Sequence, residues 1–169
     1  MALPVVFLLI VIIAERNSKS LSPDALSAFL RRAQKAVGIS GDVNVLITAN
    51  EHMRRLNRQF RQKDKPTDVL SFPSGQPNEL ADRYAGDLAI SIEIARANAQ
   101  RLRHSLEDEI KILMLHGVLH LAGYDHESDG GEMARLENRL RRKMGLPTAL
   151  ISRTHSESLN GQARRRKSK

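Results

Sequence analysis

The chain has 169 residues, 41% of them hydrophobic, so it can bury one core but is too short for two comfortable domains. It contains no cysteine, which excludes disulfides, thiolate catalysis and cysteine-ligated zinc. A tightly bound transition metal must therefore use histidine and carboxylate ligands. A reducing compartment is compatible with this composition, and we expect a cytoplasmic protein.

The formal net charge of +8 favours a polyanionic partner such as nucleic acid. Much of this charge lies in residues 153–169, which contain six Lys or Arg and one Glu. Because residues 151–169 show no hydrophobic periodicity, we predict a basic disordered tail there. Such a tail either binds nucleic acid or simply keeps the protein in solution, and the sequence leaves both explanations open.

The chain starts with an apolar run, ALPVVFLLIVII, at residues 2–13. The run is shorter than the roughly 20 apolar residues that a bilayer span needs. No Lys or Arg precedes it and no small-x-small cleavage pattern closes it, so a buried strand is favoured over an uncleaved anchor or a signal peptide. We therefore expect no membrane association.

The next two elements are a helix and a strand. Ser22 followed by Pro23 is typical of a helix start, and apolar side chains then recur at helical spacing until Gly38, which can end the helix. The stretch DVNVLIT at residues 42–48 alternates apolar and polar side chains, which predicts a half-buried strand.

A second helix is predicted to start at Thr48, because Glu51 three residues later completes a capping-box pattern. Between residues 54 and 65 the chain carries six basic residues and one acid. This run is either a solvated helix face and loop or a patch that contacts phosphates, and we favour the patch. The candidate substrate-binding residues are Arg54, Arg58, Arg61 and Lys63.

The middle of the chain predicts two more strands and then three helices. DVLSFP at residues 68–73 indicates a short strand, the polar segment 74–86 a loop, and GDLAISI at residues 86–92 another strand. Helices are predicted over residues 92–102, from Ser105 with Asp108 as its capping partner, and from Asp129 with Glu132 as its partner.

This order of elements predicts an α+β fold in a single domain over residues 1–150, followed by the tail at 151–169. We expect a small mixed β-sheet of about four strands packed with about five helices. No internal repeat is present.

The segment HGVLHLAGYDH carries three histidines, His116, His120 and His126. The first two are four residues apart on a predicted helix, so their imidazoles leave the same face. Gly123 can then turn the chain and bring the third histidine back toward them. The sequence therefore predicts a metal site on a helix and turn that bear three histidines.

Three neutral imidazoles suit one zinc ion per chain and leave a fourth position open, as in catalytic rather than structural sites. A metal with an open position can activate water near neutral pH and polarise a phosphoryl oxygen. Imidazole sites also bind nickel, copper or iron, so the sequence does not choose the metal.

The same frame is similar to the metzincin protease pattern H-E-x-x-H-x-x-G-x-x-H, except that Gly117 replaces the glutamate. That glutamate is the general base of peptide hydrolysis, so its loss argues against a metzincin-like metalloprotease. Glu127, Glu109 and Asp87 are other candidates for a base, and nothing in the sequence places any of them at the metal.

Two segments together resemble one family. LNRQFRQKDKPTDVLSFP at residues 56–73 and HGVLHLAGYDH at residues 116–126, with GDLAIS between them, are similar to the bacterial YbeY endoribonucleases. The resemblance covers residues 5–146.

This resemblance implies a zinc-dependent, single-strand-specific endoribonuclease acting in 16S rRNA 3′-end maturation and in ribosome quality control. The metal ligands of the family map to His116, His120 and His126, and its functional arginine maps to Arg61, the candidate catalytic residue. A guanidinium offers bidentate donors to phosphate oxygens, which suits that role. The expected partners are RNA, chiefly 16S rRNA or the small ribosomal subunit, with a ribosomal protein as a further candidate.

A rival hypothesis from another class stays open. In it the chain is a non-catalytic, zinc-containing ribosome-assembly factor, in which the metal is structural and the basic surface binds rRNA. A fourth protein ligand at the metal would favour this rival, and an open position favours the enzyme.

Overall fold

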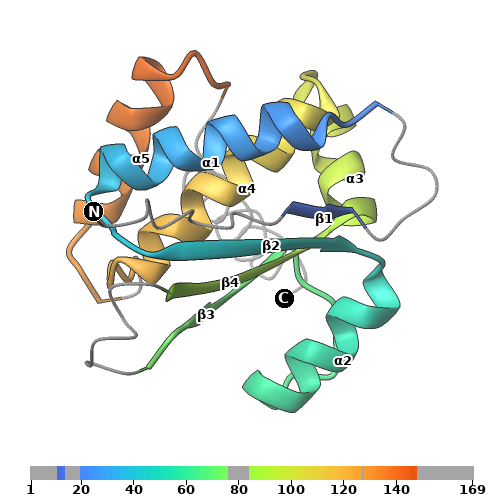
Figure 1. Ribbon diagram of the computed structural model, residues 1–169. Coiled ribbons are helices and arrows are strands. Elements are labelled where there is room, and N and C mark those ends of the chain that lie inside the picture. The colour runs from blue at the N-terminus through green and yellow to red at the C-terminus, as the bar shows by residue number, and fades with distance from the viewer. Residues whose placement is uncertain (1–10, 14–19, 76–83, 127, 148–169) are drawn as a thin grey trace, which may run out of the picture.

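The computed structural model describes residues 11–13, 20–75, 84–126 and 128–147, and over these ranges it has four strands and five helices (Figure 1). The strands are β1 (Val11–Ile13), β2 (Asp42–Thr48), β3 (Val69–Pro73) and β4 (Tyr84–Ser91). The helices are α1 (Pro23–Val37), α2 (Asn50–Arg61), α3 (Ile92–Leu102), α4 (Leu106–Leu121) and α5 (Glu132–Lys143). The predicted α+β fold with a small mixed sheet is confirmed.

The strands form one sheet in the order β1-β2-β4-β3. β1, β2 and β4 run parallel to one another, whereas β3 is an edge strand antiparallel to β4. Parallel neighbours need a crossover connection, and α1 and α2 provide helices for the two crossovers. Helices α1 and α4 lie over one face of the sheet with α5 beside them, and α2 lies on the opposite side (Figure 1).

The core fills the space between the sheet and α4. Helix α4 is buried from Ile112 to Leu119, which explains its nearly continuous apolar sequence. A much smaller cluster of Met53, Leu70 and Ala89 lies under α2. Two of the predicted metal ligands, His116 and His120, therefore lie on the most deeply buried helix of the fold.

Two of the predicted helix starts are confirmed. The Ser22 hydroxyl accepts a hydrogen bond from the Ala25 amide at 3.2 Å, and the Ser105 hydroxyl accepts one from the Asp108 amide at 3.0 Å. Each serine thus satisfies one of the amides that the first helical turn leaves without a partner. Gly38 ends α1 with a φ of 86°, as predicted.

The predicted capping box at Thr48 is wrong. Thr48 is the last residue of β2, where it pairs with Ser91 of β4, and α2 starts at Asn50 after Ala49. The Asn50 amide instead donates to a carboxylate oxygen of Glu93 from α3, at 2.9 Å. A contact between distant segments therefore replaces the local cap.

Two other predicted boundaries also move. Residues 84–86 belong to β4 rather than to the preceding loop, because they pair with the start of β2. Helix α5 starts at Glu132 instead of Asp129, since Gly131 adopts a left-handed φ of 91° just before it. The Asp129 carboxylate still caps this end, accepting from the amides of Gly131 at 2.8 Å and Met133 at 2.6 Å.

The two terminal predictions fall largely outside the described residues. Val11–Ile13 forms a strand parallel to β2, and the rest of the predicted strand at 2–13 lies outside them, as does the tail at 151–169. Among the described helices, none combines the length and apolar character needed to cross a membrane.

Candidate metal centre

The end of α4 brings the three histidines together. His116 and His120 lie one turn apart on the helix, with ring centroids 4.7 Å apart. Gly123 follows the helix with a φ of 89°, and this left-handed turn carries the chain back so that the ring of His126 lies 5.6 Å from His116 and 5.3 Å from His120. One ligand atom from each residue lies within 4.8 Å of the other two.

The nitrogen atoms of this cluster fit a metal ion. The Nε2 atoms of His116 and His120 approach to 3.1 Å, and the Nδ1 atom of His126 is buried without a hydrogen-bond partner among the described residues. Burial, and then the charges of the other two rings, lower the pKa of His120 to about 4. His120 is therefore neutral at neutral pH, which is the form that binds a metal.

The cluster lines one wall of a pocket of about 630 Å³. A second part of the lining, here called the cationic wall, comes from the C-terminal end of α2, the loop that follows it and strand β3. This wall carries three exposed cationic side chains, which are Arg61, Lys63 and Lys65. A polyanion that enters the pocket therefore meets these cations and the three imidazoles, beside the carboxyl groups of Asp68 and Asp125.

Local structure fixes the cationic wall. Helix α2 ends at Arg61 because Gln62 adopts a left-handed conformation with a φ of 57°. The buried side chain of Asn57 then donates a 2.7 Å hydrogen bond to the carbonyl oxygen of Lys65. This bond holds the loop that carries Lys63 and Lys65 against the helix.

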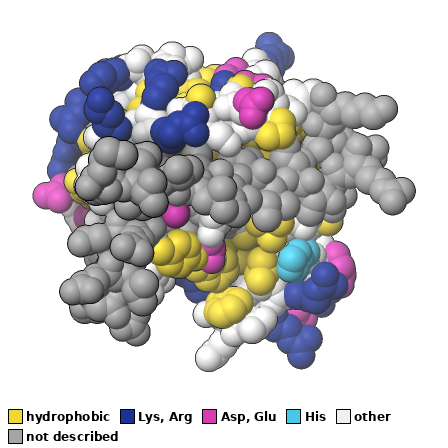
Figure 2. Space-filling model, in the orientation of Figure 1, with side chains coloured by type: hydrophobic (Ala, Val, Ile, Leu, Met, Phe, Trp, Pro, Cys, Tyr) yellow, Lys and Arg dark blue, Asp and Glu magenta, His cyan; other side chains and the backbone are white. Residues whose placement is uncertain are grey.

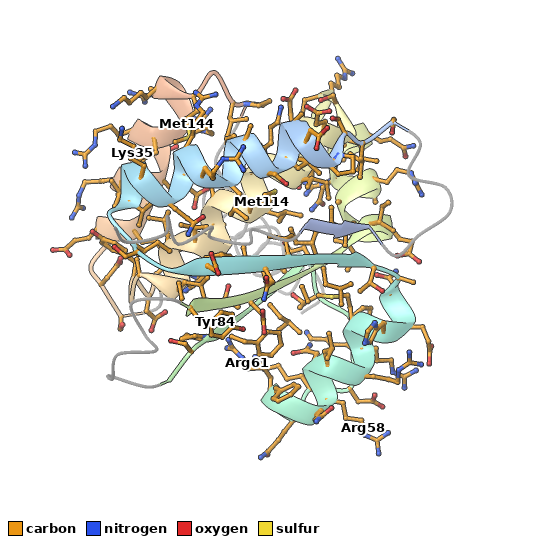
Figure 3. The ribbon with its side chains drawn as sticks, viewed as in Figure 1. Lys35, Arg58, Arg61, Tyr84, Met114 and Met144 are labelled. Atoms are coloured by element: carbon orange, nitrogen blue, oxygen red, sulfur yellow. The ribbon has the colours of Figure 1, made fainter. Side chains whose placement is uncertain are left out.

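The four predicted substrate-binding cations divide into two groups. Arg61 and Lys63 line the pocket, whereas Arg54 and Arg58 are not part of its lining. The Arg54 guanidinium donates two 2.8 Å hydrogen bonds to Asp64, which raise the pKa of Arg54 and lower that of the carboxyl. Figure 3 shows Arg61 turned toward the sheet and Arg58 pointing away from it.

Comparisons with known proteins agree with this geometry. Residues 11–145 match the sequence profile of the family described as Endoribonuclease YbeY. The chain belongs to the YbeY family.

The curated relatives include proteins named Endoribonuclease YbeY from two organisms. The one from Koribacter versatilis is 50% identical over 156 residues, which cover 92% of this chain and 99% of the relative. The one from Solibacter usitatus is 54% identical over 141 residues, covering 83% of this chain and 92% of the relative. A Thermotoga maritima protein with a known solution structure is 30% identical, with a TM-score of 0.54 over 78% of this chain and 85% of that one.

Gly117, which stands where the metzincin pattern has its glutamate, faces the core. A Cβ added at Gly117 would lie 2.6 Å from a methyl group of Leu88 on β4, and both residues are buried. Glycine here allows α4 to approach the sheet closely, so a glutamate at this position has no room. The structure thus gives a packing reason for the missing carboxylate.

Two of the other candidate bases, Glu109 and Asp87, are not among the residues that line the pocket. Glu109 is buried and lies 2.7 Å from Nε2 of His104, while Asp87 accepts a 3.0 Å hydrogen bond from the Asn44 amide. Glu127 lies outside the described residues. The general base has no assignment.

Two residues near the site are not found by sequence reasoning. Lys65 belongs to the basic run but is not one of the candidate substrate-binding residues, and its pocket position depends on the bond from Asn57. The second residue is Glu137 of α5, whose carboxylate contacts Nδ1 of His116. A signal for it existed, because Glu137 lies four residues after Met133 on the apolar stripe of the predicted helix, where a charged residue needs a partner.

Proposed function

We propose that this chain is a zinc-dependent endoribonuclease of the cytoplasm that cuts single-stranded RNA, acting in 16S rRNA 3′-end maturation and in ribosome quality control. Its relatives named Endoribonuclease YbeY support RNA cleavage. The observation that carries the proposal is the pocket that three converging imidazoles line together with Arg61 and two lysines. Residues 1–150 form the catalytic domain, and the tail at 151–169 adds affinity for RNA.

His116, His120 and His126 are the residues that hold the ion, each through one ring nitrogen. When bound, the metal supplies Lewis-acid chemistry, because it lowers the pKa of a water molecule and polarises a phosphoryl oxygen. His116 lies in the buried stretch of α4 and His120 follows it directly, which keeps these two rings in one arrangement, so little reorganisation accompanies binding.

The cationic wall binds the phosphodiester. The Arg61 guanidinium can donate two parallel hydrogen bonds to phosphate oxygens, and its positive charge stabilises the charge that develops there. Lys63 adds a mobile charge beside it. Arg54 and Arg58 lie outside the pocket, where they contact the RNA backbone further along the strand.

The rival is a ribosome-assembly factor with a structural metal. Among the described residues, the cluster contains three potential ligands, and it opens onto the pocket instead of being closed by a fourth. Structural zinc sites are almost always closed by four protein ligands, so this arrangement favours catalysis.

The test is cleavage of a labelled single-stranded RNA, and of its duplex form, by protein whose zinc content has been measured. We expect cleavage of the single strand that increases with zinc content, disappears on chelation and returns with added zinc. His116→Ala, purified in the same way, controls for contaminating nuclease. Equal cleavage by the variant and the wild type would refute the enzyme and favour the assembly factor.

A further inference from the structure

The strongest feature outside the pocket is a buried carboxylate behind the metal cluster. Glu137 lies on α5, is fully buried, and places Oε2 2.9 Å from Nδ1 of His116, whose ring is itself 6% exposed. Helices α4 and α5 lie side by side (Figure 1), and Met133 and Leu140 of α5 are buried on the same side as Glu137. Glu137 therefore reaches the metal cluster from a different element than any of the three histidines.

The two nitrogens of the His116 ring face different partners. Nδ1 faces the carboxylate of Glu137, and Nε2 faces the other histidines at 3.1 Å from Nε2 of His120. A carboxylate oxygen accepts hydrogen bonds, so this contact favours the tautomer of His116 that carries its N–H on Nδ1. This tautomer leaves a lone pair on Nε2, the atom that points into the cluster.

We propose that Glu137 is a positioning residue for the metal centre. It fixes the tautomer and the ring plane of His116 and makes Nε2 a stronger ligand, as carboxylates behind metal-binding histidines do. This inference rests on the proposed function, because it assumes that the cluster binds a metal. The inference also makes α5 necessary for tight metal binding, because this helix carries Glu137.

A second buried pair in the chain provides a matched control. Glu109 lies 2.7 Å from Nε2 of His104, and both side chains are as buried as those of the first pair. His104 is not part of the metal cluster. Glu137→Gln and Glu109→Gln therefore replace the same buried carboxyl group beside a histidine, and only the first does so behind a proposed ligand.

The experiment measures the zinc affinity of the full chain by competition with a chromophoric chelator, together with the visible spectrum of the cobalt-substituted protein. We expect Glu137→Gln to weaken zinc binding by about 10–100-fold and to change the cobalt bands. Glu109→Gln should bind zinc like the wild type even where its thermal stability falls. Equal affinities and unchanged cobalt bands in a folded Glu137→Gln protein would overturn the inference, as would equal losses in both variants.

A measurement on the wild type covers the case in which Glu137→Gln does not fold. Long-range nitrogen-15 NMR of the metal-free protein reports the tautomer of each histidine, and we expect the His116 proton on Nδ1. A proton on Nε2 would overturn the role of Glu137. If the wild type bound no zinc at all, the proposed metal centre itself would fail, so the two failures are distinguishable.

Discussion

Arg61 offers the sharpest test of the proposed pocket, because it combines an exposed side chain with a position on the cationic wall. Removal of one preorganised donor from a transition-state oxyanion costs about 2.7–4 kcal/mol, or about 10²–10³-fold in kcat. The side chain of Arg61 is exposed to solvent, which weakens its electrostatic interaction with the phosphate. We therefore expect Arg61→Ala to lower kcat by about 10²-fold, the lower end of this range. Since Arg61 lies in the last turn of α2, its loss also removes a favourable interaction with the helix dipole, of about 0.3–1 kcal/mol.

The assay is steady-state cleavage of a labelled single-stranded RNA, with circular dichroism to verify folding. Arg55→Ala is the matched control, because Arg55 is an exposed arginine of the same helix outside the pocket lining and its removal changes the net charge equally. Arg61→Lys keeps the charge but loses the planar pair of donors, so it should recover only part of the rate. If Arg61→Ala and Arg55→Ala cleaved RNA with equal kcat, the assignment of Arg61 to the reacting phosphate would be refuted.

Three further predictions concern stability and RNA binding. A Cβ at Gly86, whose φ is 146°, would overlap the carbonyl oxygen of Phe72. Gly86→Ala should therefore lower the free energy of unfolding, measured in urea, by about 2–5 kcal/mol. An unchanged urea midpoint would contradict the close packing of β3 against β4. Hydrogen bonds from the backbone, that of Met133 first, lower the pKa of Asp129, so its stabilisation is present above about pH 4 and disappears as the pH falls through the lowered value. The melting temperature of Asp129→Asn should therefore lie below that of the wild type at neutral pH and approach it in acid, and a pH-independent difference would count against this. Affinity for RNA should fall steeply as the salt concentration rises, and salt-independent binding would refute this. Deletion of residues 164–169 should make this salt dependence less steep without abolishing cleavage, and complete loss of turnover would contradict that expectation.

The predictions that succeeded depend on short-range geometry. Ser22 and Ser105 cap their helices because a hydroxyl three residues before an amide can reach it within one turn. The boundaries that failed depend on contacts between distant segments. Thr48 stays in β2 because β4 pairs with it, and Glu93 of α3 supplies the cap that the local pattern predicted from Thr48.

The sequence by itself determined the arrangement of the three histidines. The spacing of His116 and His120 on one helix face and the left-handed turn at Gly123 are properties of a short segment, so they can be derived without knowing the rest of the fold. Only the tertiary structure decided what surrounds them. It brings Arg61 and Lys65 from α2 and its loop into the same pocket, and Glu137 from α5 to the Nδ1 side of His116. These contacts join segments far apart in the chain, and packing around the shared core, which no local pattern encodes, sets their distances.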